Sequence, residues 1–229
     1  MLAADEWQIV ALSLKVSAVA VGLTLPLAFA LAWVLARSRV PGKVLLDALV
    51  HLPLVVPPVV TGWLLLLAFG ANGPIGGWLE RALGVTVMFR WTGAALAAAV
   101  MALPLMVRAI RLSLEAVDPR LEAAARTLGA GPWRAFATIT LPLALPGVLA
   151  GAVLGFARSL GEFGATITFV SNIPGETQTL PLAIYAALQV PGGESVVTRL
   201  AAISVLLSLV ALVASEVLAR RAGRGAHVL

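Results

Sequence analysis

Five long apolar stretches constrain this sequence more than any other feature, because each is long enough to cross a lipid bilayer. A helix needs roughly 20 predominantly apolar residues to span the hydrocarbon core. The chain is 60% hydrophobic and 12% charged, whereas soluble domains are about 25% charged. We therefore expect an all-α, polytopic transmembrane protein with five spans, at about 8–36, 44–69, 91–111, 142–163 and 198–219.

The segment between the last two stretches, 164–197, is apolar but interrupted. Turn-forming residues occupy 172–176 and 191–194, and the apolar piece between them, 180–190, is too short to span. Such a piece suits a re-entrant or interfacial segment. We predict a broken segment here, and a sixth span is the alternative.

The basic residues predict the orientation, because cytoplasmic loops of membrane proteins are enriched in lysine and arginine. In a five-span arrangement most of the 16 basic residues fall on one side. These are Arg37, Arg39, Lys43, Arg108, Arg111, Arg120, Arg126, Arg134, Arg220, Arg221 and Arg224. We expect the N-terminus outside and the C-terminus in the cytoplasm. Lys15 and Asp47 lie near span ends, where we expect them to reach toward the interface.

Several function classes receive no support from the residues present. The chain has no cysteine, and its two histidines, His51 and His227, are far apart in sequence, so we expect no metal site. No phosphate-binding Gly-x-x-x-x-Gly-Lys-Ser/Thr motif occurs, and no catalytic constellation suggests an intramembrane enzyme. A secondary transporter or channel is the other alternative, but intramembrane acids are few and no inverted repeat is evident. We expect a single transmembrane domain, 1–229, that binds no nucleic acid.

The longest polar connection, about 112–142, is predicted to face the cytoplasm. Asp118 can cap a helix that begins at Pro119, and Gly129 and Gly131 allow that helix to stop. Pro132 can then begin a second short helix, and Pro142 can open the fourth span. The small side chains of this helix pair would suit docking into a groove of another protein. The alternative is a passive amphipathic linker on lipid headgroups.

This loop resembles the EAA loop of the membrane subunits of prokaryotic ABC importers, whose pattern is Glu-Ala-Ala, then Gly, then Ile-x-Leu-Pro. The matching residues and their neighbours are Glu122, Ala124, Ala125, Gly129, Ala130, Gly131, Ile139, Leu141 and Pro142. One departure is that Ala123 occupies the usual place of the glutamate, and Glu122 stands one residue earlier, about 100° around a helix. The segments 6–70, 156–166 and 171–177 further resemble the oxyanion permeases of the molybdate and sulfate group.

The resemblance implies the fold of a type I ABC importer permease in the cell inner membrane, in contact with membrane lipid. It implies a homodimer on two cytoplasmic ABC ATPase subunits, supplied by a periplasmic molybdate-binding protein. ATP and Mg²⁺ would be bound by the ATPase, and no cofactor by this chain. The short chain favours molybdate, with tungstate not distinguished. A sulfate or thiosulfate importer permease is the alternative.

Two groups of residues within and after the fourth span are candidates for function. Arg158 and Glu162 are four apart on one predicted helical face, and Ser159, Thr166 and Thr168 supply hydroxyl groups nearby. We regard these five as candidate pathway or gate residues, and a structural ion pair is the alternative. Gly147, Gly151 and Gly155 recur every four residues, which predicts close helix packing within the permease. A dimer seam or moving gate surface is the alternative there.

Overall fold

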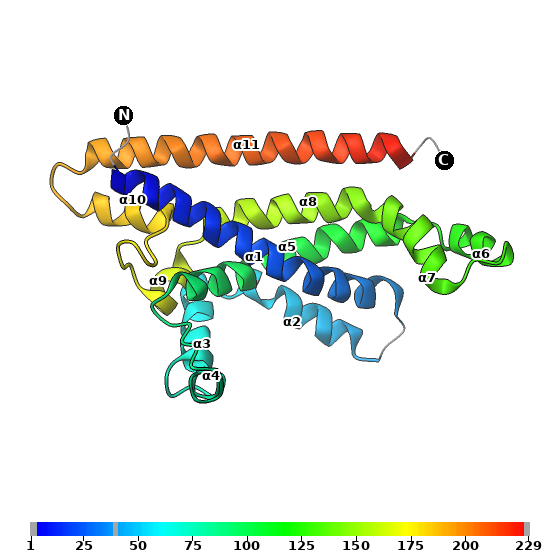
Figure 1. Ribbon diagram of the computed structural model, residues 1–229, viewed down its shortest axis with the longest axis horizontal. Helices are drawn as coiled ribbons and strands as arrows, with labels where there is room; N and C mark the ends of the chain where they lie inside the picture. The colour runs from blue at the N-terminus through cyan, green and yellow to red at the C-terminus, as the bar shows by residue number, and fades with distance from the viewer. Residues whose placement is uncertain (1–3, 39–40, 227–229) are drawn as a thin grey trace.

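The computed structural model describes residues 4–38 and 41–226, so Arg39 and His227 lie outside the described residues. The described chain is helical, without strands (Figure 1). Its elements are α1 (Ala4–Arg37), α2 (Lys43–Val55), α3 (Pro58–Phe69), α4 (Gly76–Leu83), α5 (Trp91–Ala116), α6 (Pro119–Thr127), α7 (Pro132–Ala135), the π-helix η1 (Phe136–Thr140), α8 (Leu141–Leu160), α9 (Gly164–Val170), α10 (Leu180–Leu188) and α11 (Glu194–Ala226).

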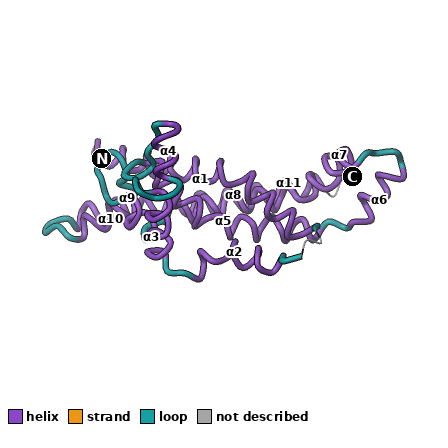
Figure 2. The backbone as a smooth tube through the Cα atoms, turned by 90° about the horizontal axis from the view of Figure 1, so that it is seen from below, coloured by secondary structure: helices purple, strands orange, loops and turns teal. Residues whose placement is uncertain are grey.

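Four long helical stretches form the body of the molecule and run lengthwise in Figures 1 and 2. The helices α6 and α7 lie beyond one end, which we call the α6 end, and the other is the far end. Helix α5 packs against both α1 and α8, and its alanines, such as Ala97 and Ala102, are fully buried. Small side chains at these contacts let the helix backbones approach closely, as in other membrane bundles.

The number of spans agrees with the five-span prediction. Among the described residues, four helices are long and apolar enough to cross a membrane, and a fifth span results if the bent pair α2–α3 is counted as one. Before α11 begins at Glu194, the broken segment contains the helices α9 and α10, of seven and nine residues. Neither is long enough to span alone, so the predicted interruption of 164–197 is confirmed.

The second span is not the single helix predicted for 44–69. Helices α2 and α3 meet at an angle of 114° across Val56 and Pro57. The break follows from two consecutive prolines, because Pro57 and Pro58 lack backbone donors and restrict the residues before them. Pro53, in contrast, lies inside α2 without ending it. As a result α3 and α4 project from the side of the bundle near the far end (Figure 1).

The fourth span also differs from its predicted bounds. Pro132 does not begin a separate short helix, because the chain remains helical from Pro132 to Leu160. Pro142 therefore lies inside this stretch rather than at its start. A proline ring clashes with the carbonyl four residues earlier, and the wider π-helical turn Phe136–Thr140 lies directly before it, with the Leu141 N–H donating to the Phe136 carbonyl. At the far end the helix stops at Leu160, before Glu162.

Candidate coupling and translocation sites

Helix α6 begins as the sequence predicts and is then held against the bundle by Glu122. The Asp118 carboxylate accepts from the backbone N–H of Arg120 at 2.9 Å. The Glu122 carboxylate accepts from the hydroxyl of Thr140 in η1 and lies 3.4 Å from the guanidinium of Arg37 at the end of α1. The same Arg37 donates to the Val117 carbonyl at 3.3 Å. Glu122 thus faces its own bundle and connects α6 to α1 and to the fourth span.

Other side chains of this loop are exposed, and two of them are large and apolar. Leu128 is 89% exposed and Trp133 82% exposed. Arg120, Arg126 and Arg134 of the same loop are exposed as well. Of the residues that match the EAA pattern, Ala124, Gly129, Gly131 and Pro142 are exposed, and Ala125, Ala130, Ile139 and Leu141 are half-buried. Gly129 has φ +89°, a left-handed conformation that glycine adopts without strain. Large apolar side chains that are this exposed, beside exposed arginines in the same loop, suit contact with another protein.

An aromatic cluster supports this surface from below. The rings of Trp33 and Phe136 meet edge to face with centroids 5.1 Å apart, and Trp133 contacts Phe136 at 6.3 Å. Trp33 belongs to α1, so the cluster joins α1 to the start of the fourth span. The exposed Trp133 is therefore in contact with packed aromatic rings on one side.

The three glycines of α8 face α5. A Cβ built on Gly147 would lie 2.2 Å from the Cβ of Ser113, and one on Gly155 would lie 2.6 Å from the sulfur of Met106. At Gly151 the nearest atoms, in Ile110 and Met106, would be at 3.2 Å. This face is therefore occupied by packing within the chain.

Arg158 and Glu162 form an ion pair at the far end of the fourth span, with 2.7 Å between Nη2 and Oε2. The Arg158 side chain is 26% exposed and that of Glu162 only 2%. The other carboxylate oxygen of Glu162 accepts from the backbone N–H of Ala165 at 2.8 Å, at the start of α9. Glu162 therefore joins α8 to α9 although it lies outside both helices.

Replacing Arg158 with alanine tests the structural alternative for this pair. The change leaves the buried Glu162 without its counter-charge. We expect the free energy of unfolding to fall by about 2 kcal/mol. This is less than the 3–5 kcal/mol for breaking a fully buried ion pair, because Arg158 is partly exposed. Thermal unfolding of the purified permease measures this loss.

The double variant Arg158→Met with Glu162→Gln is the matched control, because glutamine still accepts from Ala165. A structural pair predicts that this double variant regains the stability. If Arg158 instead contacts the transported anion directly, the double variant is expected to regain stability but still to fail in uptake of the anion. Unchanged stability in Arg158→Ala would contradict a structural role.

The other candidate pathway residues do not share one surface. Ser159 and Thr166 are buried, and the Ser159 hydroxyl has no hydrogen-bond partner in the described part of the chain. The Thr168 hydroxyl donates to the Gly164 carbonyl at 2.9 Å, within α9. Helix α9 packs against α3, where a Cβ on Gly62 would lie 2.8 Å from the Cβ of Thr168. Of this group, Thr168 lies at the contact between α9 and α3, and Ser159 and Thr166 are buried.

The structure adds charged contacts that sequence reasoning missed. Glu6 of α1 and Arg199 of α11 form an ion pair at 2.8 Å, although the two residues are at opposite ends of the chain. Lys15 lies over the ring of Trp91, 3.6 Å from its centroid, and Asp47 pairs with Arg111 at 2.9 Å. Both Lys15 and Asp47 therefore have partners within the protein. The pattern of span ends gave no signal for these pairings, because each joins separate helices.

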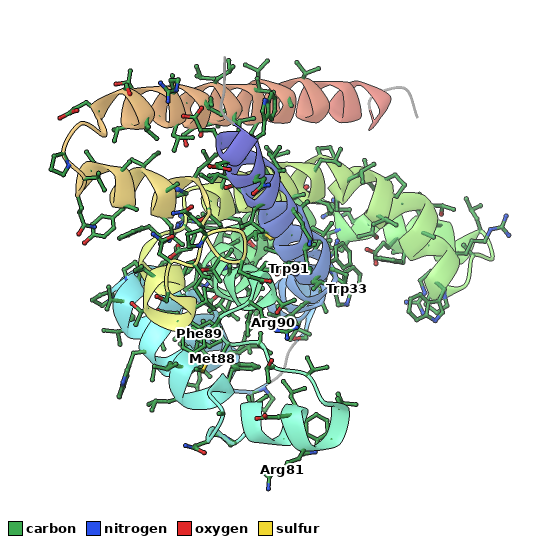
Figure 3. The ribbon with its side chains drawn as sticks, turned by 60° about the vertical axis from the view of Figure 1, so that its left-hand side comes forward. Trp33, Arg81, Met88, Phe89, Arg90 and Trp91 are labelled. Atoms are coloured by element: carbon green, nitrogen blue, oxygen red, sulfur yellow. The ribbon has the colours of Figure 1, made fainter. Side chains whose placement is uncertain are left out.

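Trp91 is reached by an irregular segment that leads from α4 into α5. Met88, Phe89 and Arg90 follow one another along it, and Arg81 on α4 points away from the body (Figure 3). Phe89 has φ +58°, an uncommon conformation for a bulky residue. This segment places Trp91 beside an apolar groove of about 530 Å³ between α1, α3 and α5.

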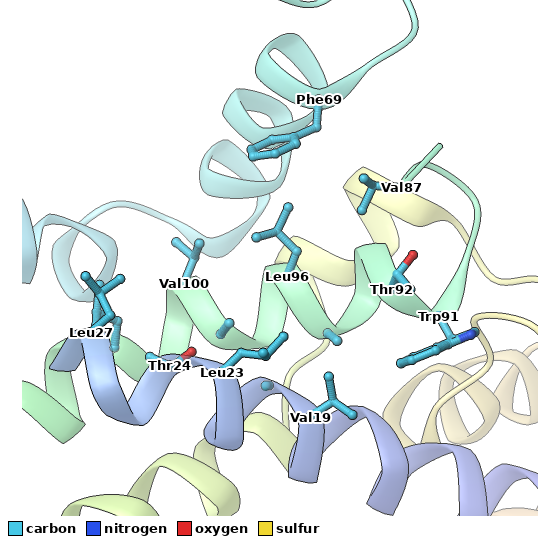
Figure 4. Close-up of a pocket in the computed structure, with 14 residues that line it drawn as sticks. Val19, Leu23, Thr24, Leu27, Phe69, Val87, Trp91, Thr92, Leu96 and Val100 are labelled. Carbon is cyan, nitrogen blue, oxygen red and sulfur yellow. The ribbon is translucent and has the colours of Figure 1, made fainter. Parts of the chain in front are cut away.

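The groove is unsuited to an oxyanion. Figure 4 shows the side chains of Leu23, Leu27, Leu96 and Val100 along it, and its lining offers only a few polar groups, from Thr24, Thr92 and the indole of Trp91. An anion there would lose its hydration without enough hydrogen-bond donors in return. Among the described residues, no group of three His, Asp or Glu side chains could hold a metal ion.

A bundle of five spans with a protruding, exposed loop between the third and fourth is the architecture of a membrane transport subunit. Residues 24–224 match the family model of the binding-protein-dependent transport system inner membrane component, so the chain belongs to that family. It is a multi-pass inner-membrane subunit of an ABC importer and is not an enzyme. In these importers ATP hydrolysis is carried by a separate subunit that works with the permease.

Particular relatives narrow the comparison. The chain is 61% identical over 228 residues to the molybdenum transport system permease protein ModB of Escherichia coli strain K12, which covers 98% of this chain and 100% of the relative. It is 41% identical to the sulfate transport system permease protein CysT of the same strain, over 77% of this chain and 65% of the relative. The crystal structure of a bacterial ABC transporter involved in alginate import superposes with a TM-score of 0.75 at 17% identity, covering 96% of this chain and 80% of that one, which shows the shared fold.

Proposed function

We propose that this chain is the membrane-spanning subunit that carries molybdate into the cytoplasm in an ATP-driven importer. The observation that carries the proposal is the 61% identity, over nearly the full chain, to a molybdenum transport permease. The lower identity to a sulfate permease, over a smaller part of both chains, supports molybdate over the alternative of sulfate or thiosulfate. Tungstate has nearly the size and charge of molybdate, so it belongs to the proposed substrate class.

The proposed partners follow from exposed surfaces. Leu128 and Trp133 offer an apolar docking surface for a cytoplasmic ATPase, which would bind ATP and Mg²⁺ while this chain binds no cofactor. Large exposed apolar side chains on α2 and α3 support contact with a second copy of this chain; they are Val44, Leu45, Leu49, Val55, Val59 and Trp63. In the proposed assembly two permeases work with two ATPases, the whole of 1–229 forms one permease domain, and a periplasmic molybdate-binding protein supplies the anion.

The proposed orientation places the α6 end in the cytoplasm. Those of the predictive basic residues that the structure describes lie at that end, from Arg37 and Arg111 to the last turns of α11 (Figure 1). The absence of native cysteine allows single-cysteine labelling without background. Cysteine at the exposed Gly131 is expected to react only from the cytoplasmic side, and cysteine at Leu83, 62% exposed near the far end, only from outside. The reverse pattern would overturn the orientation.

The function is tested by uptake of labelled molybdate into proteoliposomes that contain the permease, its ATPase and the binding protein. We expect uptake that depends on ATP and resists excess sulfate but is reduced by tungstate. Equal competition by sulfate would favour the alternative. A complex that assembles and transports sulfate but not molybdate would overturn the proposed substrate and leave the family assignment intact.

A further inference from the structure

A polar cavity of about 340 Å³ lies between α2 and α5 at the α6 end. Its lining residues are Asp47, His51, Arg108, Arg111, Leu112 and Glu115. A single water needs only about 10–15 Å³ of such space. The cavity therefore has room for a small hydrated ion, and it differs from the apolar groove in the chemistry of its walls.

Helix periodicity brings these side chains together. Arg108, Arg111 and Glu115 lie three and four residues apart on one face of α5, and Asp47 and His51 are four apart on α2. The two faces are turned toward each other, since Asp47 and Arg111 form an ion pair across them. The cavity thus lies over the last turns of α5, immediately before the loop that carries α6.

The guanidinium of Arg111 is held in a fixed orientation. Its Nη1 donates to the Asp47 carboxylate at 2.9 Å, and its Nε donates to Glu115 at 2.8 Å. The His51 Nδ1 lies 2.9 Å from the Asp47 carbonyl oxygen, so it carries a proton and donates there. Arg111 still has N–H donors at Nη2.

Arg108 brings a second positive charge to the cavity, and no ion pair compensates it in the described part of the chain. Its side chain is exposed and lines the same cavity. The planar guanidinium group matches the oxygens of a phosphate-like anion and can donate two hydrogen bonds to it. The chemistry of the free donors in this cavity is therefore that of an oxyanion site.

We propose that this cavity is a low-affinity binding site for a tetrahedral oxyanion. Arg108 and the free donors of Arg111 would bind the anion. The carboxylates of Asp47 and Glu115 oppose an anion and limit its affinity, which suits a place where the ion must leave again. Two sources share this chemistry: the free oxyanion that is transported and the phosphate of an anionic lipid headgroup. The first rests on the proposed function.

The test measures occupancy directly, by protection of a single cysteine from a neutral maleimide. Leu112→Cys places the thiol in the cavity wall, at a residue that is 61% exposed. The assembled transporter is placed in phosphatidylcholine nanodiscs, with tungstate as the probe and sodium chloride at equal ionic strength as the control. We expect labelling to slow by about threefold at a tungstate concentration of twice the Kd. A second set of nanodiscs contains one third phosphatidylglycerol and no tungstate.

Protection by tungstate would identify the free oxyanion as the ligand of this site. Protection by phosphatidylglycerol alone would identify lipid phosphate as the ligand. In either case Arg108→Gln is expected to abolish protection. Arg90→Gln, at the exposed start of the same helix, is the charge-matched control and is expected to leave protection unchanged. The proposed site would be contradicted if neither set of nanodiscs showed protection, or if protection survived Arg108→Gln. Equal protection by chloride would also contradict it. Because labelling does not require transport, failed uptake with intact protection would count only against the proposed function.

Discussion

Replacing Trp133 with aspartate is expected to lower the affinity of the ATPase for the permease by at least tenfold while the permease still folds. Trp133 is 82% exposed, so its loss removes little packing from the permease itself. Exposed aromatic residues at the centre of an interface often contribute 2 kcal/mol or more, roughly 30-fold in affinity. An aspartate there would also bury an unpaired charge in the complex.

Co-purification of the ATPase with tagged permease measures this effect. Leu128→Asp, at a residue 89% exposed on the same surface, should act in the same direction. Trp78→Asp is the matched control, because Trp78 is 57% exposed on α4 near the far end. Normal recovery of the ATPase with both Trp133→Asp and Leu128→Asp would sink the proposed docking surface.

A second large effect is expected from adding one methyl group at Gly147. Alanine there would bring its Cβ to 2.2 Å from the Cβ of Ser113 and 3.0 Å from the Ala109 carbonyl oxygen, so α5 and α8 must separate. Overpacking of this kind costs about 1–3 kcal/mol. Helix propensity acts in the opposite direction, because alanine is favoured over glycine by about 1 kcal/mol. A lower thermal midpoint of Gly147→Ala would therefore show that the close contact outweighs propensity.

Gly22→Ala provides the control for this experiment. Gly22 also lies within a long helix, α1, but a Cβ there meets nothing within 4 Å. We expect its thermal midpoint to stay the same or rise. If Gly147→Ala and Gly22→Ala behave alike, then α5 and α8 do not pack in the register that the structure gives.

Local sequence signals predicted those parts of the fold that depend on neighbouring residues. The apolar stretches placed the long helices, and Asp118 before Pro119 placed the start of α6 together with its side-chain cap. The effect of each proline on its helix was predicted less well. Pro57 and Pro58 turn the chain by 114°, whereas Pro53 and Pro142 lie inside helical stretches. Whether a proline ends a helix depends on the neighbouring helices that compensate for the lost donor, and periodicity carries no such information.

The candidate sites show the same division. The residues of the coupling loop follow one another in sequence, and their exposure could be anticipated from a polar connection between two spans. The partners of Glu122, in contrast, come from Arg37 and Thr140 on different elements. The polar cavity needs α2 and α5 side by side, so neither His51 nor Arg108 stands out alone. Contacts between helices distant in sequence required the tertiary structure.

The uninterrupted helical path from Pro132 to Leu160 has a mechanical consequence. At 1.5 Å per residue, its 29 residues measure about 43 Å. Trp133 and Arg158 therefore lie near opposite ends of one continuous helical stretch. A tilt of about 10° around the α6 end would carry the other end through roughly 7 Å, about the diameter of a hydrated ion. Small angular changes at the α6 end would thus be amplified into displacements of several ångströms at the far end.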